Sequence, residues 1–142
     1  MIAPLDSKYL PLAQTALRIG AGLAYFSHGG AKLFGWFGGM GPEGGTVALA
    51  SRFGAAGVIE VVLGACLVLG LWTRLAAFLA SGEMAVAYFW IHVGGSGQLF
   101  WWNNGGELVM LFSFIWLLFA AWGAGSFSLD ARMGKGAGAP TP

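Results

Sequence analysis

Ionisable and amide side chains interrupt the long apolar stretches of this sequence, where they could exchange protons or hold a charged group. Carboxyl and imidazole groups could donate and accept protons, and cationic groups could steady a developing negative charge. Such groups are costly in an apolar solvent, so they are the first candidates for a functional role. The predicted catalytic residues are His28 and Glu60. The predicted ligand-binding residues are Arg18, Lys32, Glu83, His92, Asn104 and Glu107.

Four apolar runs are long enough to position these side chains across a bilayer, which needs about 20 mostly apolar residues per helix. The expected helices cover residues 12–34, 53–71, 74–92 and 106–122. Short links force neighbouring helices to be antiparallel. We therefore predict an all-α fold, a polytopic membrane protein whose antiparallel four-transmembrane-helix bundle forms one domain over residues 1–133. The Gly-, Ala- and Pro-rich tail at 134–142 is expected to be disordered.

The composition supports a membrane solvent and excludes some functions. Hydrophobic residues make up 57% of the chain and charged residues 9%, against about 25% in an average globular domain. No predicted helix has a wide charged face, which disfavours a soluble bundle. The formal net charge of +1 gives no basis for binding nucleic acid. A single cysteine, Cys66, excludes an internal disulfide and a paired-cysteine redox motif.

The distribution of basic residues predicts the orientation, because Lys and Arg favour the cytoplasmic side of a membrane. The side that carries both termini holds Lys8, Arg18, Arg74, Arg132 and Lys135. The opposite side holds Lys32 and Arg52. Both termini are therefore predicted to be cytoplasmic. Residues 36–52 should form an outer loop with a short surface helix at 46–51, and the aromatic residues 100–102 should lie at the outer membrane interface.

Depth estimates bring most of the polar candidates together. At about 1.5 Å of rise per residue, every candidate except Arg18 and Glu83 lies toward the outer face. Gly57 and Gly64 flank Glu60 and would let a ligand or a neighbouring backbone approach it. A structural role is the alternative, in which Glu60 pairs with Lys32 and Glu83 pairs with Arg18.

An internal similarity suggests a repeat. The stretch from Tyr25 to Phe34 resembles the stretch from Tyr88 to Phe100 once small gaps are allowed. Each stretch closes an odd-numbered helix, and the next helix carries a Glu. This pattern is typical of a parallel repeat of two helix pairs about an axis along the membrane normal.

The motifs as a group resemble the DoxX family over about residues 11–130. The most specific part is in the first helix, where an Arg is followed by His-Gly and then by Lys-Leu-Phe-Gly. The matching residues are Arg18-Ile19-Gly20, Phe26 to Gly35, Ile59-Glu60, Gly64, Leu69-Gly70-Leu71, Thr73-Arg74-Leu75-Ala76, Asn104-Gly105-Gly106-Glu107 and Phe127-Ser128-Leu129-Asp130.

The resemblance implies a multi-pass protein of the bacterial inner membrane with four helices. Some members of the family are associated with redox work, as a membrane subunit of a thiosulfate:quinone oxidoreductase or as a membrane partner in an oxidative-stress complex. The leading hypothesis is a membrane subunit of a respiratory or a sulfur and thiol redox system, with a quinone or a similar small lipophilic ligand in the polar groove between its helices. His28 or Glu60 would exchange a proton with a quinone oxygen, and Lys32 or Arg18 would stabilise negative charge. The chain is expected to supply at most a membrane subunit of an oxidoreductase.

Two other functions stay open at this point. The chain could be a non-enzymatic anchor or assembly factor that packs its Gly faces against protein partners or against further copies of itself. It could also carry a small metabolite or protons, with Glu60 and Glu83 as a relay at two depths. Neither haem nor a metal ion is expected, because nothing in the sequence fixes the separation of the two histidines.

Overall fold

The computed structural model describes residues 7–134, and this part of the chain consists of helices without strands. Its long helices are α1 (Leu10–Phe34), α2 (Arg52–Leu69), α3 (Thr73–Ala87) and α6 (Glu107–Trp122). The short helices are η1 (Ser7–Tyr9), η2 (Trp36–Gly38), η3 (Pro42–Gly44), η4 (Tyr88–Val93), α4 (Gly94–Ser96), α5 (Trp101–Asn104) and α7 (Leu129–Arg132). The tail predicted to be disordered lies, from residue 135 onward, outside the described residues.

Local signals explain where α1 and α2 begin and end. Pro11 lies in the first turn of α1, where its missing N–H costs nothing. Ser51 caps α2 by accepting a hydrogen bond from the N–H of Gly54 at 3.1 Å. Gly70 follows α2 with φ +68°, a left-handed conformation that ends the helix two residues before the predicted end at residue 71.

The third helical segment is longer than predicted. Helical structure runs without a break from Thr73 to Ser96, four residues beyond the predicted end at 92. Its C-terminal part includes η4, a π-helix, which has a wider turn that is often found at functional sites. The short helix predicted at 46–51 is wrong: this stretch has no helix, and the Val47 N–H bonds to the Lys32 carbonyl oxygen at 2.9 Å.

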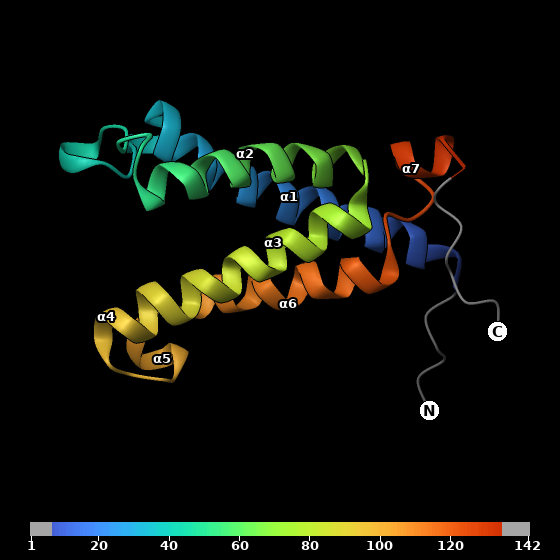
Figure 1. Cartoon of the computed structure of the whole chain (residues 1–142). Helices are drawn as coiled ribbons and strands as arrows, with labels where there is room; N and C mark the ends of the chain where they lie inside the picture. Colours follow the sequence, from blue (N-terminus) through green and yellow to red (C-terminus); the bar gives the residue numbers. More distant parts are fainter. Residues whose placement is uncertain (1–6, 135–142) are drawn as a thin grey trace.

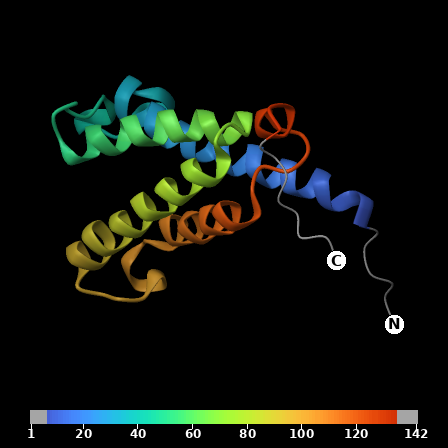
Figure 2. The ribbon, with the colours of Figure 1, turned by 45° about the vertical axis from the view of Figure 1, so that its right-hand side comes forward.

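The long helices form two pairs, α1 with α2 and α3 with α6 (Figure 1). The pairs meet at one end of the molecule and diverge toward the other, as the turned view also shows (Figure 2). The closed end, where they meet, holds Gln14, Arg18, Gly70 and Asp130. The open end holds Lys32, Arg52 and Trp90.

Small residues bring the helices of each pair close together. In the first pair, the backbone of Gly29 lies against the carbonyl oxygen of Gly57 and against Val61, so a side chain at Gly29 would have no room. In the second pair, alanines of α3 pack against large aromatic residues of α6. The buried core consists of Tyr25, Leu67, Ala76, Ala77, Ala80, Met84, Phe112, Trp116 and Phe119.

The distribution of polarity is the reverse of that in a water-soluble protein. Charged and amide side chains are buried, among them Gln14, Arg18, Lys32 and Glu60. Large apolar side chains are exposed along every long helix; examples are Leu23, Val62, Phe78 and Phe114. Lys, Arg and Glu are almost never fully buried in soluble domains unless they are paired. Two helical stretches, Arg52–Leu69 and Thr73–Ser96, are long and apolar enough to cross a membrane, and α6 is a shorter apolar helix.

Candidate ligand-binding cavity

A cavity of about 560 Å³ lies between the two helix pairs, toward the open end. Its walls come from α1, α2, α3, η4 and α6, and most of the side chains on them are apolar. The polar side chains that line it are Tyr25, His28, Lys32, Arg52, Glu60, Glu83 and His92. Five of the eight sequence-predicted site residues, His28, Lys32, Glu60, Glu83 and His92, therefore lie on one cavity.

An ion pair between α1 and α2 forms one wall of the cavity. Lys32 Nζ lies 2.5 Å from both carboxylate oxygens of Glu60, and both side chains are buried. The predicted pairing of Glu60 with Lys32 is therefore present. An ammonium group has three N–H donors, so one donor of Lys32 remains for another acceptor. The pair neutralises both charges and still offers a hydrogen bond.

A second carboxyl group faces the same space from α3. The Tyr25 hydroxyl donates a hydrogen bond to Oε2 of Glu83 at 3.1 Å. Glu83 is half-buried, and both residues line the cavity. The predicted pairing of Glu83 with Arg18 is wrong, because Arg18 lies at the closed end and bonds to backbone carbonyls there. Glu83 instead has the phenol of Tyr25 as its hydrogen-bonding partner.

His28 is a second cavity residue with unused hydrogen-bonding capacity. It lies one helical turn before Lys32 on α1 and is half-buried. Its ring packs edge-on against Phe112, with 6.3 Å between the ring centroids. Within the described part of the chain, no group hydrogen-bonds to its ring nitrogens. A neutral imidazole has one donor and one acceptor, so His28 can bind a ligand of either kind.

Arg18 does not reach the cavity. Its Nε donates to the Ala124 carbonyl at 3.1 Å, and one terminal nitrogen donates to the carbonyls of Leu67 and Val68 at 2.6 and 2.7 Å. The other terminal nitrogen donates to Phe127 at 2.7 Å. The Leu67 and Val68 carbonyls belong to the last turn of α2, where helix carbonyls lack intrahelical partners. Arg18 thus joins α1, the end of α2 and the segment after α6.

The remaining predicted residues lie near the open end. His92 lines the cavity, and its Nδ1 is 3.1 Å from the backbone oxygen of Asn104. The Asn104 side chain instead orders its own loop, because its Nδ2 donates to the Gln98 carbonyl at 3.0 Å and its Oδ1 accepts from the Gly106 N–H at 2.7 Å. Glu107 is exposed at the start of α6 and does not line the cavity.

Two important residues were absent from the predicted site. Tyr25 was identified only as part of the internal repeat, although it precedes Lys32 by seven residues and therefore lies on the same polar face of α1. Asp130 was identified only through the family resemblance. Its carboxylate accepts hydrogen bonds from the N–H groups of Trp72 and Thr73, both at 2.8 Å, and so caps α3. In residues 7–134, no three His, Cys, Asp or Glu side chains gather closely enough to hold a metal ion.

The apolar exterior and the buried charges define a helical membrane protein, and the mostly apolar cavity with a few polar groups is its candidate site for a small ligand. Residues 13–93 match the profile of the DoxX family, and the chain belongs to this family. The resemblance expected from the sequence is thereby confirmed. A protein of Haemophilus influenzae that is named only as uncharacterized is 44% identical over 133 residues, which cover 90% of this chain and 96% of the relative. No solved structure matches the chain.

Proposed function

We propose that this protein is a subunit of a redox system in the bacterial inner membrane and that its cavity binds a quinone or a similar small lipophilic ligand. The observation that carries the proposal is the combination of a mostly apolar cavity with three sets of proton-exchanging groups on its walls. These groups are His28, the Tyr25–Glu83 pair and the Lys32–Glu60 pair. Small-molecule sites are commonly apolar cavities with a few convergent polar groups.

The proposed topology has four membrane crossings within one domain of residues 1–133, with α1 and α6 crossing beside the two longer apolar stretches. Both termini would lie in the cytoplasm. The Lys32–Glu60 ion pair supports this orientation. Glu60 neutralises the positive charge of Lys32, so Arg52 is the basic side chain at the described open end whose charge no carboxylate neutralises. Arg18, Arg74 and Arg132 belong to the closed end, which would face the cytoplasm by the positive-inside rule.

The chemistry would divide between this chain and a partner. Reduction of a quinone to a quinol takes up two electrons and two protons, and a partner oxidoreductase subunit would supply the electrons. The free N–H of Lys32 and a nitrogen of His28 would hydrogen-bond to a quinone oxygen. Glu60 and Glu83 would pass protons toward that oxygen, Glu83 through the Tyr25 hydroxyl. Arg18 has no part in this scheme.

Quinone binding can be measured directly. The protein is purified gently, analysed for a copurifying quinone by mass spectrometry and absorbance, and then titrated with ubiquinone in lipid nanodiscs while its tryptophan fluorescence is followed. We expect the wild type to bind and His28→Ala and Glu60→Gln to bind at least about tenfold more weakly, equivalent to about 1.4 kcal/mol. Glu43→Gln is the matched control, because Glu43 is exposed on the outer loop and does not line the cavity. Equal affinity in all four proteins would contradict the proposal.

The two alternatives give different results in related tests. An anchor for a partner complex would lose partner binding on a bulky change at an exposed glycine such as Gly20, and would not respond to Glu60→Gln. A carrier needs a route past the closed end, which Leu67, Trp116 and Arg18 fill. If the protein is a carrier, Glu83→Gln alone should abolish transport in reconstituted vesicles.

A further inference from the structure

The two sides of the cavity are built differently. On the side of α1 and α6, aromatic rings close it: the Tyr25 ring lies 6.0 Å from the Phe112 ring and 5.7 Å from the Trp116 ring. His28 adds its contact with Phe112. On the side of α2 and α3, the described residues of the two helices share no hydrogen bond or ion pair. Aromatic contacts therefore bridge α1 and α6, whereas no hydrogen bond or ion pair between described residues bridges α2 and α3.

Apolar side chains form the edges of this second side. Ile59 of α2 and Val86 of α3 both line the cavity, and they are 38% and 56% exposed. Exposed apolar side chains on the apolar stretches Arg52–Leu69 and Thr73–Ser96 belong to the surface that faces lipid. The seam between α2 and α3 is thus continuous with the lipid-facing surface of the protein.

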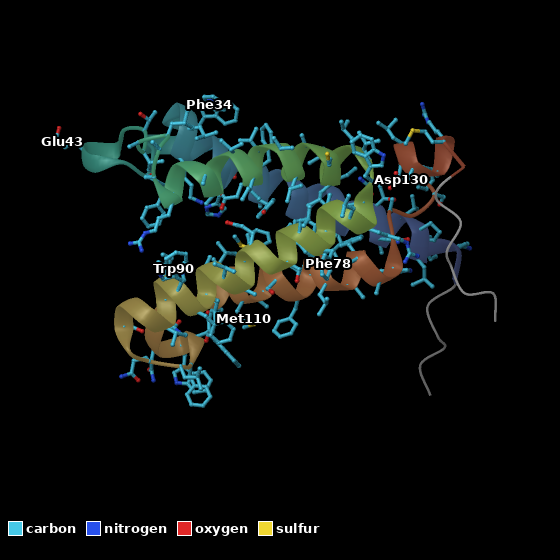
Figure 3. All side chains as sticks on the ribbon, viewed as in Figure 1. Phe34, Glu43, Phe78, Trp90, Met110 and Asp130 are labelled. Carbon is cyan, nitrogen blue, oxygen red and sulfur yellow. The ribbon has the colours of Figure 1, made fainter. Side chains whose placement is uncertain are left out.

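One interaction spans the seam at its outer end. The Arg52 guanidinium carbon lies 5.9 Å from the centre of the Trp90 ring, and both residues line the cavity. Figure 3 shows Trp90 in the gap between the two helix pairs. A cation–π contact between exposed groups is weak, so it can open and re-form easily. Trp90 belongs to the π-helical η4, and Gly94 and Gly95 follow directly.

Three hydrogen-bonding groups on α1 face the cavity, and Glu60 of α2 and Glu83 of α3 bond to two of them, Lys32 and Tyr25. Tyr25, His28 and Lys32 all come from α1, whereas the seam has Ile59 and Val86 at its edges. A molecule that entered through the seam would meet the hydrogen-bonding groups with its leading end. Its trailing end would remain among apolar side chains and lipid.

We propose that the cavity is entered sideways from the bilayer, between α2 and η4, when Arg52 and Trp90 separate, and that the ligand is a lipid with a small ring-shaped polar head and a long isoprenoid-type tail. This inference rests on the proposed function and specifies its ligand. The head occupies the cavity of about 560 Å³, and the tail stays in the seam and the surrounding lipid. Arg52 and Trp90 are positioning residues that control entry and take no part in proton transfer.

A reversible cross-link across the seam tests this route. Arg52→Cys and Trp90→Cys are combined in a Cys66→Ala background, so that Cys66 cannot react, and a short bis-methanethiosulfonate reagent joins the pair in nanodiscs. The exchange rate of a long-tailed ubiquinone is followed by tryptophan fluorescence and compared with that of a tailless benzoquinone. The matched controls are the two single-cysteine variants treated with the same reagent.

We expect the cross-link to slow exchange of the tailed quinone at least about tenfold and reduction of the cross-link to restore it, with a smaller effect on the tailless compound. Lateral entry is overturned if the tailed quinone exchanges equally fast in a protein that mass spectrometry shows to be fully cross-linked. It is also overturned if the tailless compound binds and the tailed one does not. If the wild type binds neither, the proposed function fails, and the ligand assigned here fails with it.

Discussion

The closed and open ends of the molecule both bury charged groups, but the partners of those groups differ. At the closed end, Arg18 donates to backbone carbonyls and Asp130 accepts from backbone N–H groups. At the open end, Lys32 pairs with Glu60 and Tyr25 with Glu83, side chain to side chain, on the walls of the cavity. Backbone partners are fixed by the helices, whereas side-chain partners can rearrange. The kind of partner therefore separates a buried charge that the helix backbones hold in place from one whose side-chain partner can move.

The closed end also matches charge to helix polarity. Arg18 lies at the last turn of α2, where the helix dipole is negative, and Asp130 lies at the first turn of α3, where it is positive (Figure 3). Between them, Trp72 has φ +46°, an unusual value for a residue other than glycine. Asp130 binds the N–H of this residue and stabilises a turn that would otherwise be strained.

Replacement of Arg18 should give the largest effect. Arg18→Met leaves four buried or half-buried carbonyls without their donor and is expected to reduce the free energy of unfolding by about 3–5 kcal/mol, as the loss of one buried ionic partner does. Denaturant unfolding in detergent, followed by circular dichroism, measures it. Arg132→Met removes an exposed arginine and should cost less than about 0.5 kcal/mol. Similar free energies of unfolding for the two variants would contradict the structural role assigned to Arg18.

The Lys32–Glu60 pair should give a smaller effect that a second substitution repairs. Lys32→Met leaves a buried carboxylate unpaired and is expected to cost about 3 kcal/mol. Adding Glu60→Leu should bring stability back to within about 1 kcal/mol of the wild type, since an apolar pair of similar volume can replace a buried ion pair. The double variant should still fail to bind quinone. A double variant as unstable as the single one would show that the open end is built like the closed end.

Asp130→Ala should have a moderate effect. It removes the cap of α3 and is expected to cost about 1–2 kcal/mol, measured by the same unfolding experiment. Asp130→Asn, which keeps one acceptor, should lose less. If Asp130→Ala unfolded like the wild type, the turn at Trp72 would not depend on its cap.

The smallest change in stability is expected at the open end. Tyr25→Phe removes the hydrogen bond to Glu83 and should cost no more than about 1 kcal/mol, while quinone affinity falls several-fold. Glu107→Gln, at an exposed position, should change neither quantity measurably. A large loss of stability in Tyr25→Phe with unchanged affinity would reverse the roles assigned to the two ends.

The sequence predicted those features that depend on one helix at a time. Helical spacing places His28 and Lys32 on one face of α1, and residue types suggest a Lys32–Glu60 pair. The partner of Arg18 could not be predicted, because its acceptors are main-chain oxygens at residues 67, 68, 124 and 127, and every residue type has such an oxygen. Asn104 and Glu107 have a suitable depth, but the direction of their side chains depends on the path of a loop.

The meeting of the helix pairs at a single end has a mechanical consequence. The helical stretch from Thr73 to Ser96 has 24 residues, so it is a lever about 36 Å long at 1.5 Å per residue. A change of about 5° in the angle between the pairs would move its outer end by about 3 Å. A partner that docks at the closed end could impose such a small change of angle. The opening between the helix pairs at the open end would then widen or narrow by about the width of a methyl group.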